Sequence, residues 1–385
     1  MLTEREGRNL YLQNATRPGV GPAVQDDGVL GTAKMANWKG ASPMKILRAL
    51  SGLLVLFVAT TAQGAGQVIA GPDGPVEFIG LERWGAQDLF DAIQAIDPDR
   101  PFHACAIVMR EDLGFADAAA IRTMDVLTRG DYTIMIGVED SARVRHRPTG
   151  DETVAVPEAW QNLSAVVGDD LRTLNAIEIA LPSRGGFLDR ILRTSRRSGQ
   201  RMGVDPGTLD QAWDAIDSAD SEEDRRLAHE VLAKDSLWSA RTVATLVLGN
   251  FGDDATTWHA LAGSLIDPHA RVSSAARSVL KRLIKHRKDP VDWSGARTHL
   301  VALLDGTNAF AFREILRIMV ATDIDPDFGR QLIRESPELL LAHVGAAHET
   351  AREPALDFLK AVSGEDFGAD VEAWTAWIND LGAVG

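Results

Sequence analysis

Residues 265–280 read LIDPHARVSSAARSVL, and they determine the fold class of the C-terminal half of the chain. Apolar and small residues recur there at helical spacing (i, i+3, i+4, i+7, i+8): Val272, Ala275, Ala276, Val279 and Leu280. An Asp-Pro pair precedes them, and we expect Asp267 to cap the helix while Pro268 occupies its first position, where a missing N–H is harmless. The stripe is wide enough to face neighbours on two sides, so it predicts a helix packed within an array of helices.

The same pattern recurs from about residue 209 to residue 381. Three further Asp-Pro or Ser-Pro pairs punctuate it, at residues 289–290, 325–326 and 336–337. The first helices of successive pairs are expected to end near Asp235, Asp267 and Asp305, which lie 32 and 38 residues apart. Spacings of this size are typical of two-helix repeats.

Two segments of this region resemble a known family. Residues 265–280 resemble a HEAT repeat, and residues 358–377 (FLKAVSGEDFGADVEAWTAW) are similar to the closing segment of bacterial HEAT-repeat proteins, roughly TGxDFGxDxxxWxxW, with Ser363 in place of the usual Thr. The resemblance implies an all-α HEAT-like solenoid over residues 209–381. Trp374 falls on the apolar face of the last helix, whereas Trp377 lies one position off that face and is either a cap for the last repeat or a contact site.

The preceding region has a mixed pattern. We expect a strand at residues 75–80, a helix ending near Ile96, a second helix that carries Cys105, and two strands, of which the clearer spans residues 132–138. This order and the phrase EFIGLE at residues 77–82 resemble a POTRA domain over residues 76–140. The predicted fold class is therefore a small α+β domain, residues 76–182, followed by the all-α solenoid, so that the protein is mostly α overall.

Residues 142–200 are harder to interpret. Ile177, Ile179 and Leu181 alternate with less apolar residues as they would in a strand. Residues 183–208 are rich in Arg and are expected to form a basic linker between the two domains.

The start of the chain contains a targeting signal. Residues 44–64 (MKILRALSGLLVLFVATTAQG) combine two cations, an apolar core of 14 residues and small residues before a cleavage point between Gly64 and Ala65. A membrane-spanning helix needs about 20 apolar residues, so we interpret the segment as a cleaved secretory signal without stable membrane insertion afterwards. Residues 1–43 lack apolar periodicity, so we expect them to be disordered and translation to start at Met44. The predicted location is secreted, in the bacterial periplasm.

Composition excludes several classes of partner and site. The 385-residue chain has 55 Asp and Glu against 40 Lys and Arg, a formal charge of −15. Such a surface is repelled by nucleic acid and by anionic lipid headgroups, so neither is expected as the main partner. The single cysteine, Cys105, excludes an internal disulfide and a zinc site of the paired-cysteine type.

No catalytic motif stands out. Di-iron HEAT-repeat hydroxylases use four His-Glu pairs, whereas this chain has two, at residues 229–230 and 348–349. His103 and Cys105 would point about 200° apart on a helix. Ser278 and Lys281 match SxxK without its companion motifs, and no HExxH, P-loop, GxGxxG or GxSxG occurs. We therefore predict no enzyme activity, cofactor or metal.

The function predicted from these observations is a non-enzymatic scaffold that binds another protein through the solenoid. Candidate partner contacts are a cationic cluster and one tryptophan: Arg277, Lys281, Arg282, Lys285 and Trp377. A second interpretation of the cluster is that its cations complement the C-terminal dipole of their helix. The alternative function is a hydrolase or a small-ligand-binding protein with a site between the two domains. The oligomeric state stays open.

Overall fold

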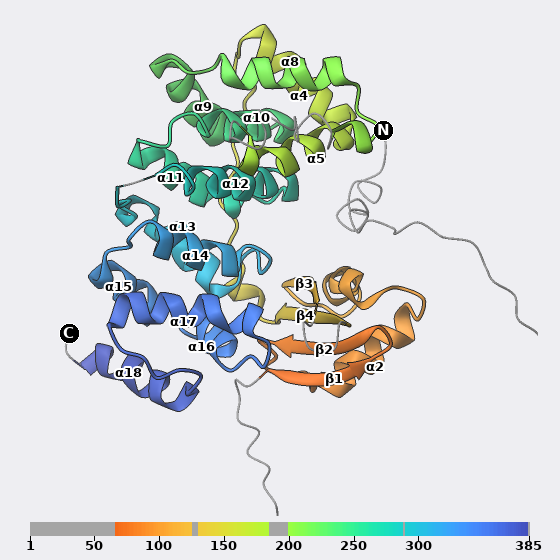
Figure 1. The fold of residues 1–385 in the computed structure, drawn as a ribbon, viewed down its shortest axis with the longest axis vertical. Helices are drawn as coiled ribbons and strands as arrows, with labels where there is room; N and C mark the ends of the chain where they lie inside the picture. Colours follow the sequence, from red (N-terminus) through yellow and green to blue (C-terminus); the bar gives the residue numbers. More distant parts are fainter. Residues whose placement is uncertain (1–65, 125–129, 185–198, 288, 384–385) are drawn as a thin grey trace, which may run out of the picture. The chain divides into compact units, whose positions relative to one another are not determined.

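A four-stranded mixed sheet forms the N-terminal part of the structure. The computed structural model describes residues 66–124, 130–184, 199–287 and 289–383, all of which fall in one unit, residues 62–385. The proposed leader with Gly64 and Ala65, residues 1–43 and most of the basic linker lie outside the described residues. The strands are β1 (Gln67–Gly71), β2 (Gly74–Ile79), β3 (Asp117–Met124) and β4 (Asp131–Val138), arranged in the order β1-β2-β4-β3 (Figure 1).

The sheet combines two hairpins around a parallel pair. Strands β1 and β2 are antiparallel, β2 and β4 are parallel, and β3 and β4 are antiparallel. The sequence predicted β2, β3 and β4 but not β1, which is five residues long and lies at an edge. Gly74 has φ +136°, and a Cβ there would lie 1.9 Å from the carbonyl oxygen of Asp131, so only glycine fits the turn.

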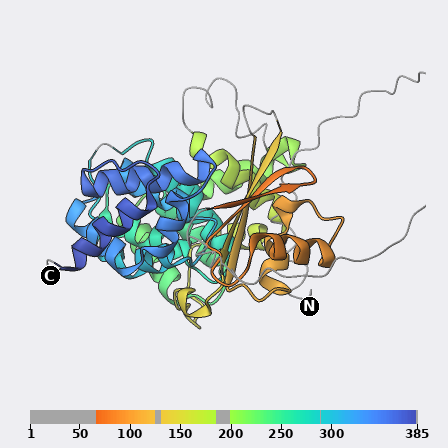
Figure 2. The same cartoon turned by 90° about the horizontal axis from the view of Figure 1, so that it is seen from below.

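Both faces of the sheet are covered. Met135 faces a cluster with α2 (Ala86–Ile96), η2 (Phe102–Ala104) and α3 (Ala106–Glu111), whereas Ile134 and Ile136 belong to the core of the C-terminal helices. The alternation follows from the two-residue period of a strand. Figure 2 shows the strands between α2 and those helices. The strict alternation of β4 in sequence therefore corresponds to two buried faces.

Most of the described residues are helical, as predicted. After the sheet the helices are η3 (Ser141–Arg143), α4 (Glu158–Asp169), α5 (Leu171–Ala180), η4 (Leu181–Ser183), α8 (Pro206–Asp217), α9 (Glu222–Lys234), α10 (Trp238–Leu248), α11 (Ala255–Leu265), α12 (Ala270–Leu283), η5 (Ser294–Ala296), α13 (Arg297–Asp305), α14 (Phe312–Ala321), α15 (Pro326–Glu335), α16 (Glu338–Val344), α17 (Glu349–Ser363) and α18 (Val371–Ala383). Some consecutive helices pack on one another, among them α9 with α10, α10 with α11, α11 with α12, and α16 with α17, and so do α10 with α12, α12 with α14, and α14 with α17.

The strand predicted around Ile177 is wrong, because these residues form helix α5. Leu174, Ile177 and Leu181 are buried at helical spacing, whereas Ile179 is 52% exposed. Three alternating residues are too few to separate a strand from a helix when apolar residues also recur at i, i+3 and i+7. Helices α4 and α5 pack on α10 and α12 and share their core.

The predicted Asp-Pro and Ser-Pro caps are correct at one of four positions. No helix begins at residues 289–290, and α16 begins at Glu338 after Pro337, without a side-chain cap from Ser336. Asp325 caps α15 by accepting a hydrogen bond from Phe328 N at 2.8 Å, and Pro326 occupies the first helical position. Helix α12 begins instead at Ala270, with His269 as its cap. The carboxylate of Asp267 binds two arginines, as described below, and the N–H of His269, while the side chain of His269 accepts the N–H of Arg271 within the helix.

The last helix closes the packed region. Trp374 is fully buried, donates from Nε1 to the carbonyl of Gly368 at 2.9 Å, and contacts the edge of the Trp377 ring. Asp370 accepts a hydrogen bond from Ala373 N at 2.9 Å, which satisfies one free N–H at the start of α18. Helix α18 packs on α15 and α16. Trp374 is thus a core residue, and Trp377 packs partly buried against the same core.

Candidate functional site

A basic, extended segment crosses the ends of three helices. We call residues 139–157, between β4 and α4, the strap; its one regular element is η3. Figure 1 shows it in yellow. Arg143, Arg145 and Arg147 alternate along it, so an extended backbone places them on the same side. The last carbonyls of a helix lack partners within the helix and carry partial negative charge, so they attract such cations and N–H groups.

The first contact of the strap is at the end of α13. Arg143 donates from Nε to the carbonyl of Asp305 at 3.0 Å, and Arg145 N donates to Thr307 Oγ1 at 2.8 Å. The guanidinium of Arg145 also pairs with the carboxylate of Asp305. The strap therefore binds both the main-chain carbonyl and the side-chain carboxylate of Asp305 at the end of α13.

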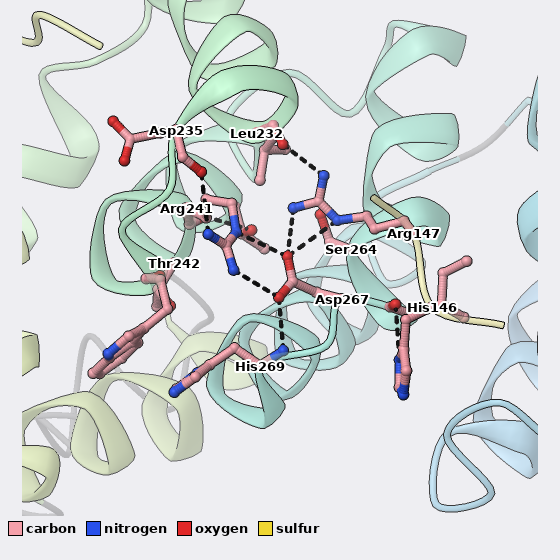
Figure 3. Close-up of polar contacts among 12 residues, drawn as sticks. His146, Arg147, Leu232, Asp235, Arg241, Thr242, Ser264, Asp267 and His269 are labelled. Carbon is pink, nitrogen blue, oxygen red and sulfur yellow. Dashed lines mark hydrogen bonds and ion pairs between the residues drawn. The ribbon is translucent and has the colours of Figure 1, made fainter. Parts of the chain in front are cut away.

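The second contact is at the end of α11 and is the most buried. Arg147 N donates to the carbonyl of Ile266 at 3.0 Å, and the Arg147 guanidinium donates to Asp267. Arg241, from α10, binds the same carboxylate from the other side, with both nitrogen–oxygen distances 3.0 Å (Figure 3). The side chain of Asp267 is 0% exposed, while those of Arg147 and Arg241 are 10% and 4% exposed.

The charge of Asp267 depends on these two arginines. Burial by itself would raise its pKa, but the hydrogen bond from Arg241 and the charge of Arg147 outweigh it, and the pKa lies below the usual range. The remaining guanidinium donors are also used: Arg147 Nη1 donates to the carbonyl of Leu232 at 2.6 Å, and Arg241 Nη1 to that of Ser236 at 2.8 Å. Such a charged, hydrogen-bonded cluster fixes the position of the strap.

The third contact is at the end of α9. Glu152 N donates to the carbonyl of Lys234 at 3.0 Å, Ser236 N donates to the carbonyl of Glu152 at 2.9 Å, and Val154 N donates to Asp235 Oδ2 at 2.9 Å. A Cβ on Gly150 would lie 1.9 Å from the carbonyl oxygen of Lys234, so the two backbones meet closely there.

The three aspartates that mark the predicted repeat spacing are therefore the residues that the strap contacts, in reverse order along the chain. The repeat spacing in the sequence located these aspartates, but no pattern predicted that the strap contacts them. The available signal was the alternation of arginines in RVRHR, residues 143–147, which is typical of an extended chain that presents one charged side.

A cavity of about 280 Å³ lies between the strap and α13. We call it the strap cavity. It is lined by strap residues, the first turn of α13 and neighbouring side chains: Arg145, His146, Arg147, Pro148, Ile266, Arg297, Thr298, His299, Val301, Ala302 and Glu335. Burial lowers the pKa of His299, and the charge of Arg147 lowers it further. A predominance of cationic side chains around this cavity contrasts with the acidic composition of the chain.

The predicted cationic cluster divides between two places. Arg277 lies over the ring of Phe310, 4.4 Å from its centroid, and Lys281 pairs with Glu314 at 2.7 Å. Arg317 binds the same carboxylate at 3.3 Å. We call these five residues, on α12, on α14 and in the loop before α14, the α12–α14 patch. Phe310 is 38% exposed there, whereas most large apolar side chains are buried.

Arg282 and Lys285 lie elsewhere, toward η4. Lys285 donates to the carbonyl of Pro182 at 2.8 Å. Burial lowers the pKa of Arg282, and the nearby charge of Arg184 lowers it further. Trp377, the remaining candidate contact, packs against Trp374 with ring centroids 5.9 Å apart.

The residues considered for metal or catalytic chemistry are scattered. His348 caps α17 and packs on Tyr132, and His229 lies 3.5 Å from Thr256 Oγ1. Cys105 is buried, and burial raises its pKa to about 11. Within the described residues, no three or more His, Cys, Asp or Glu side chains are grouped so that they could hold a metal ion.

Comparison of the chain with protein-family models, curated proteins and solved structures finds no match. Among the described residues, no helix has both the length and the apolar character required to cross a membrane.

Proposed function

We propose that this protein is a non-enzymatic scaffold that binds the acidic surface of another protein through the α12–α14 patch. The observation that carries the proposal is the exposed ring of Phe310 with the guanidinium of Arg277 stacked on it. Aromatic and Arg side chains contribute most of the binding energy in many interfaces. A guanidinium stacked on a ring can still donate from the N–H groups at its edge to a carboxylate of the partner.

The charge of the patch supports an acidic partner. Arg277, Lys281 and Arg317 provide three positive charges against the one carboxylate of Glu314. On a chain with a formal charge of −15, such a local excess steers an acidic surface to this place rather than to its surroundings.

The proposed architecture is a POTRA-like domain followed by a HEAT-like solenoid in an exported protein. Support for the first part comes from the order of strands and helices over β2, α2, α3, β3 and β4, with β4 between β2 and β3. Support for the second comes from helices that pack on the next helix but one, among them α10 on α12, α11 on α13, and α15 on α17. Repeat arrays present long surfaces that suit protein binding.

The test is photo-crosslinking from position 310 in cells that express the full chain. A photoreactive side chain in place of Phe310 should give a discrete crosslinked protein, and Arg277→Glu should abolish that product by reversing the local charge. Phe367, which is 36% exposed and contacts Trp374, is the matched control position. An identical product from position 367, or no product from position 310, would contradict the proposal.

A further inference from the structure

The strap cavity has the size and the hydrogen-bond donors of a small binding site. Its volume of about 280 Å³ lies just below the range of roughly 300–1,000 Å³ that holds drug-sized ligands, so it suits a smaller molecule. Its walls come from the strap, the end of α11, the start of α13 and the end of α15. Because the Arg147–Asp267–Arg241 cluster holds the strap, the cavity is pre-formed.

Two arginines at this cavity have unused donors. Arg145 pairs with Asp305, and Arg297 pairs with Glu335, each through Nη2. Within the described part of the chain, Nε and Nη1 of both guanidinium groups have no other hydrogen bond. Both side chains are 52% exposed, so these donors are accessible. A guanidinium edge matches the two oxygens of a carboxylate and can bind them bidentately.

A third donor comes from His299, whose ring lines the cavity and has no hydrogen-bond partner among the described residues. Its lowered pKa leaves it neutral near pH 7, with one N–H available to donate. The ring therefore supplies a directional hydrogen bond without a full charge.

The rest of the lining restricts the class of ligand. Ile266, Val301 and Ala302 form an apolar wall, which fits a short hydrocarbon arm rather than a fully polar ion. Glu335 is the one acidic side chain in the lining; Asp267 and Asp305 bind the arginines but do not line the cavity. A second negative charge on the ligand would be repelled by Glu335, so a monoanion fits better than phosphate or a dicarboxylate.

We propose that the strap cavity binds a small organic monocarboxylate, with its carboxylate between Arg145 and Arg297 and its hydrocarbon arm on Ile266, Val301 and Ala302. The proposal does not depend on the α12–α14 patch, so either one can fail without the other.

The experiment is titration of the full chain with hexanoate by calorimetry, with hexanamide and inorganic phosphate as comparison probes. Hexanoate should bind at least about tenfold more tightly than hexanamide, because only the carboxylate makes charge-assisted hydrogen bonds. Arg297→Gln and Arg145→Gln should each weaken hexanoate binding by about tenfold or more. The matched control is Arg330→Gln, which removes an equivalent surface pair with Asp327 and should change nothing.

Glu335→Gln has an effect of opposite sign, which misfolding cannot mimic. It removes the one acidic group in the lining and releases Arg297 from its pair, so hexanoate should bind several-fold more tightly. Equal binding of hexanoate and hexanamide, equal binding of phosphate, or unchanged affinity in Arg297→Gln would each overturn the proposal.

Discussion

The sheet and the strap are consecutive in the chain, yet they attach to the helices by different interactions. The sheet uses an apolar face that includes Ile134 and Ile136, with Glu77 as a buried polar contact to His348 N at 3.1 Å. The strap also packs three valines on the core of the C-terminal helices, Val144, Val154 and Val156, but it adds arginines and backbone N–H groups that bind helix ends. Apolar packing is strong but has little direction. The hydrogen bonds at the ends of α13, α11 and α9, in contrast, determine which strap residue contacts which helix.

Because charged contacts hold the strap, we expect substitutions in it to lower the free energy of unfolding most where these charges are buried. Asp267→Ala leaves the guanidinium groups of Arg147 and Arg241 buried without a counter-ion, and we expect a loss of about 3–5 kcal/mol in the free energy of unfolding. Urea denaturation measures it. Asp327→Ala, at an exposed helical pair, is the control and should cost less than about 1 kcal/mol. Equal losses in the two variants would show that the cluster does not anchor the strap.

On the sheet side, the largest effect should come from lost volume. Ile136→Ala removes buried apolar atoms where the sheet meets the helices, and we expect a loss of about 3 kcal/mol. The same denaturation experiment on Ile136→Val should give about 1 kcal/mol. A loss under about 0.5 kcal/mol for Ile136→Ala would mean that this face contributes little to the attachment.

Two histidines of the helical region, His343 in α16 and His269 before α12, titrate well below the usual range of histidine. Burial lowers the pKa of His343 to about 4, as it does that of His269, which caps α12 beside Asp267. Below pH 6.5 the unfolded chain binds protons that these folded side chains exclude, so stability should fall as pH falls from 6.5 toward 4. For His343 the full effect, reached below about pH 4, is roughly 3 kcal/mol.

Urea denaturation at several pH values between 7 and 5 measures this dependence. His343→Gln and His269→Gln should each flatten it by a similar amount, because each removes one group whose pKa is about 4 in the folded chain. An unchanged slope in His343→Gln would show that the native state accommodates the imidazolium.

The smallest loss of stability is expected at the exposed contact of the strap, where Arg145 pairs with Asp305 at the end of α13. Asp305→Ala removes the partner of Arg145, whose side chain is about half exposed, so the loss should be under about 1 kcal/mol and should shrink at high salt. Denaturation at low and high ionic strength measures it. A loss as large as that of Asp267→Ala would contradict the proposed difference between the buried contact at α11 and the exposed contact at α13.

Much of the fold could be predicted from apolar periodicity. Val272, Val279 and the other stripe residues of α12 are buried, and Trp374 lies in the core, because a helix with one apolar face must cover it. The strand prediction at Ile177 was wrong because a short window fits two periods. Neither the α12–α14 patch nor the strap cavity could be predicted in this way. Phe310 and Glu335 contact cations from other helices, and no local sequence pattern indicates such a contact.

By itself, the sequence determined that residues from about 209 to 381 form helices with apolar faces, and that aspartates recur near the ends of these helices at about 32–38 residues. Only the tertiary structure decided what those aspartates do. Asp325 and Asp267 both precede a proline, yet one caps a helix and the other binds arginines 26 and 120 residues away in the chain. A capping hydrogen bond depends on neighbours three residues away, whereas an ion pair depends on which distant side chains the fold brings within reach.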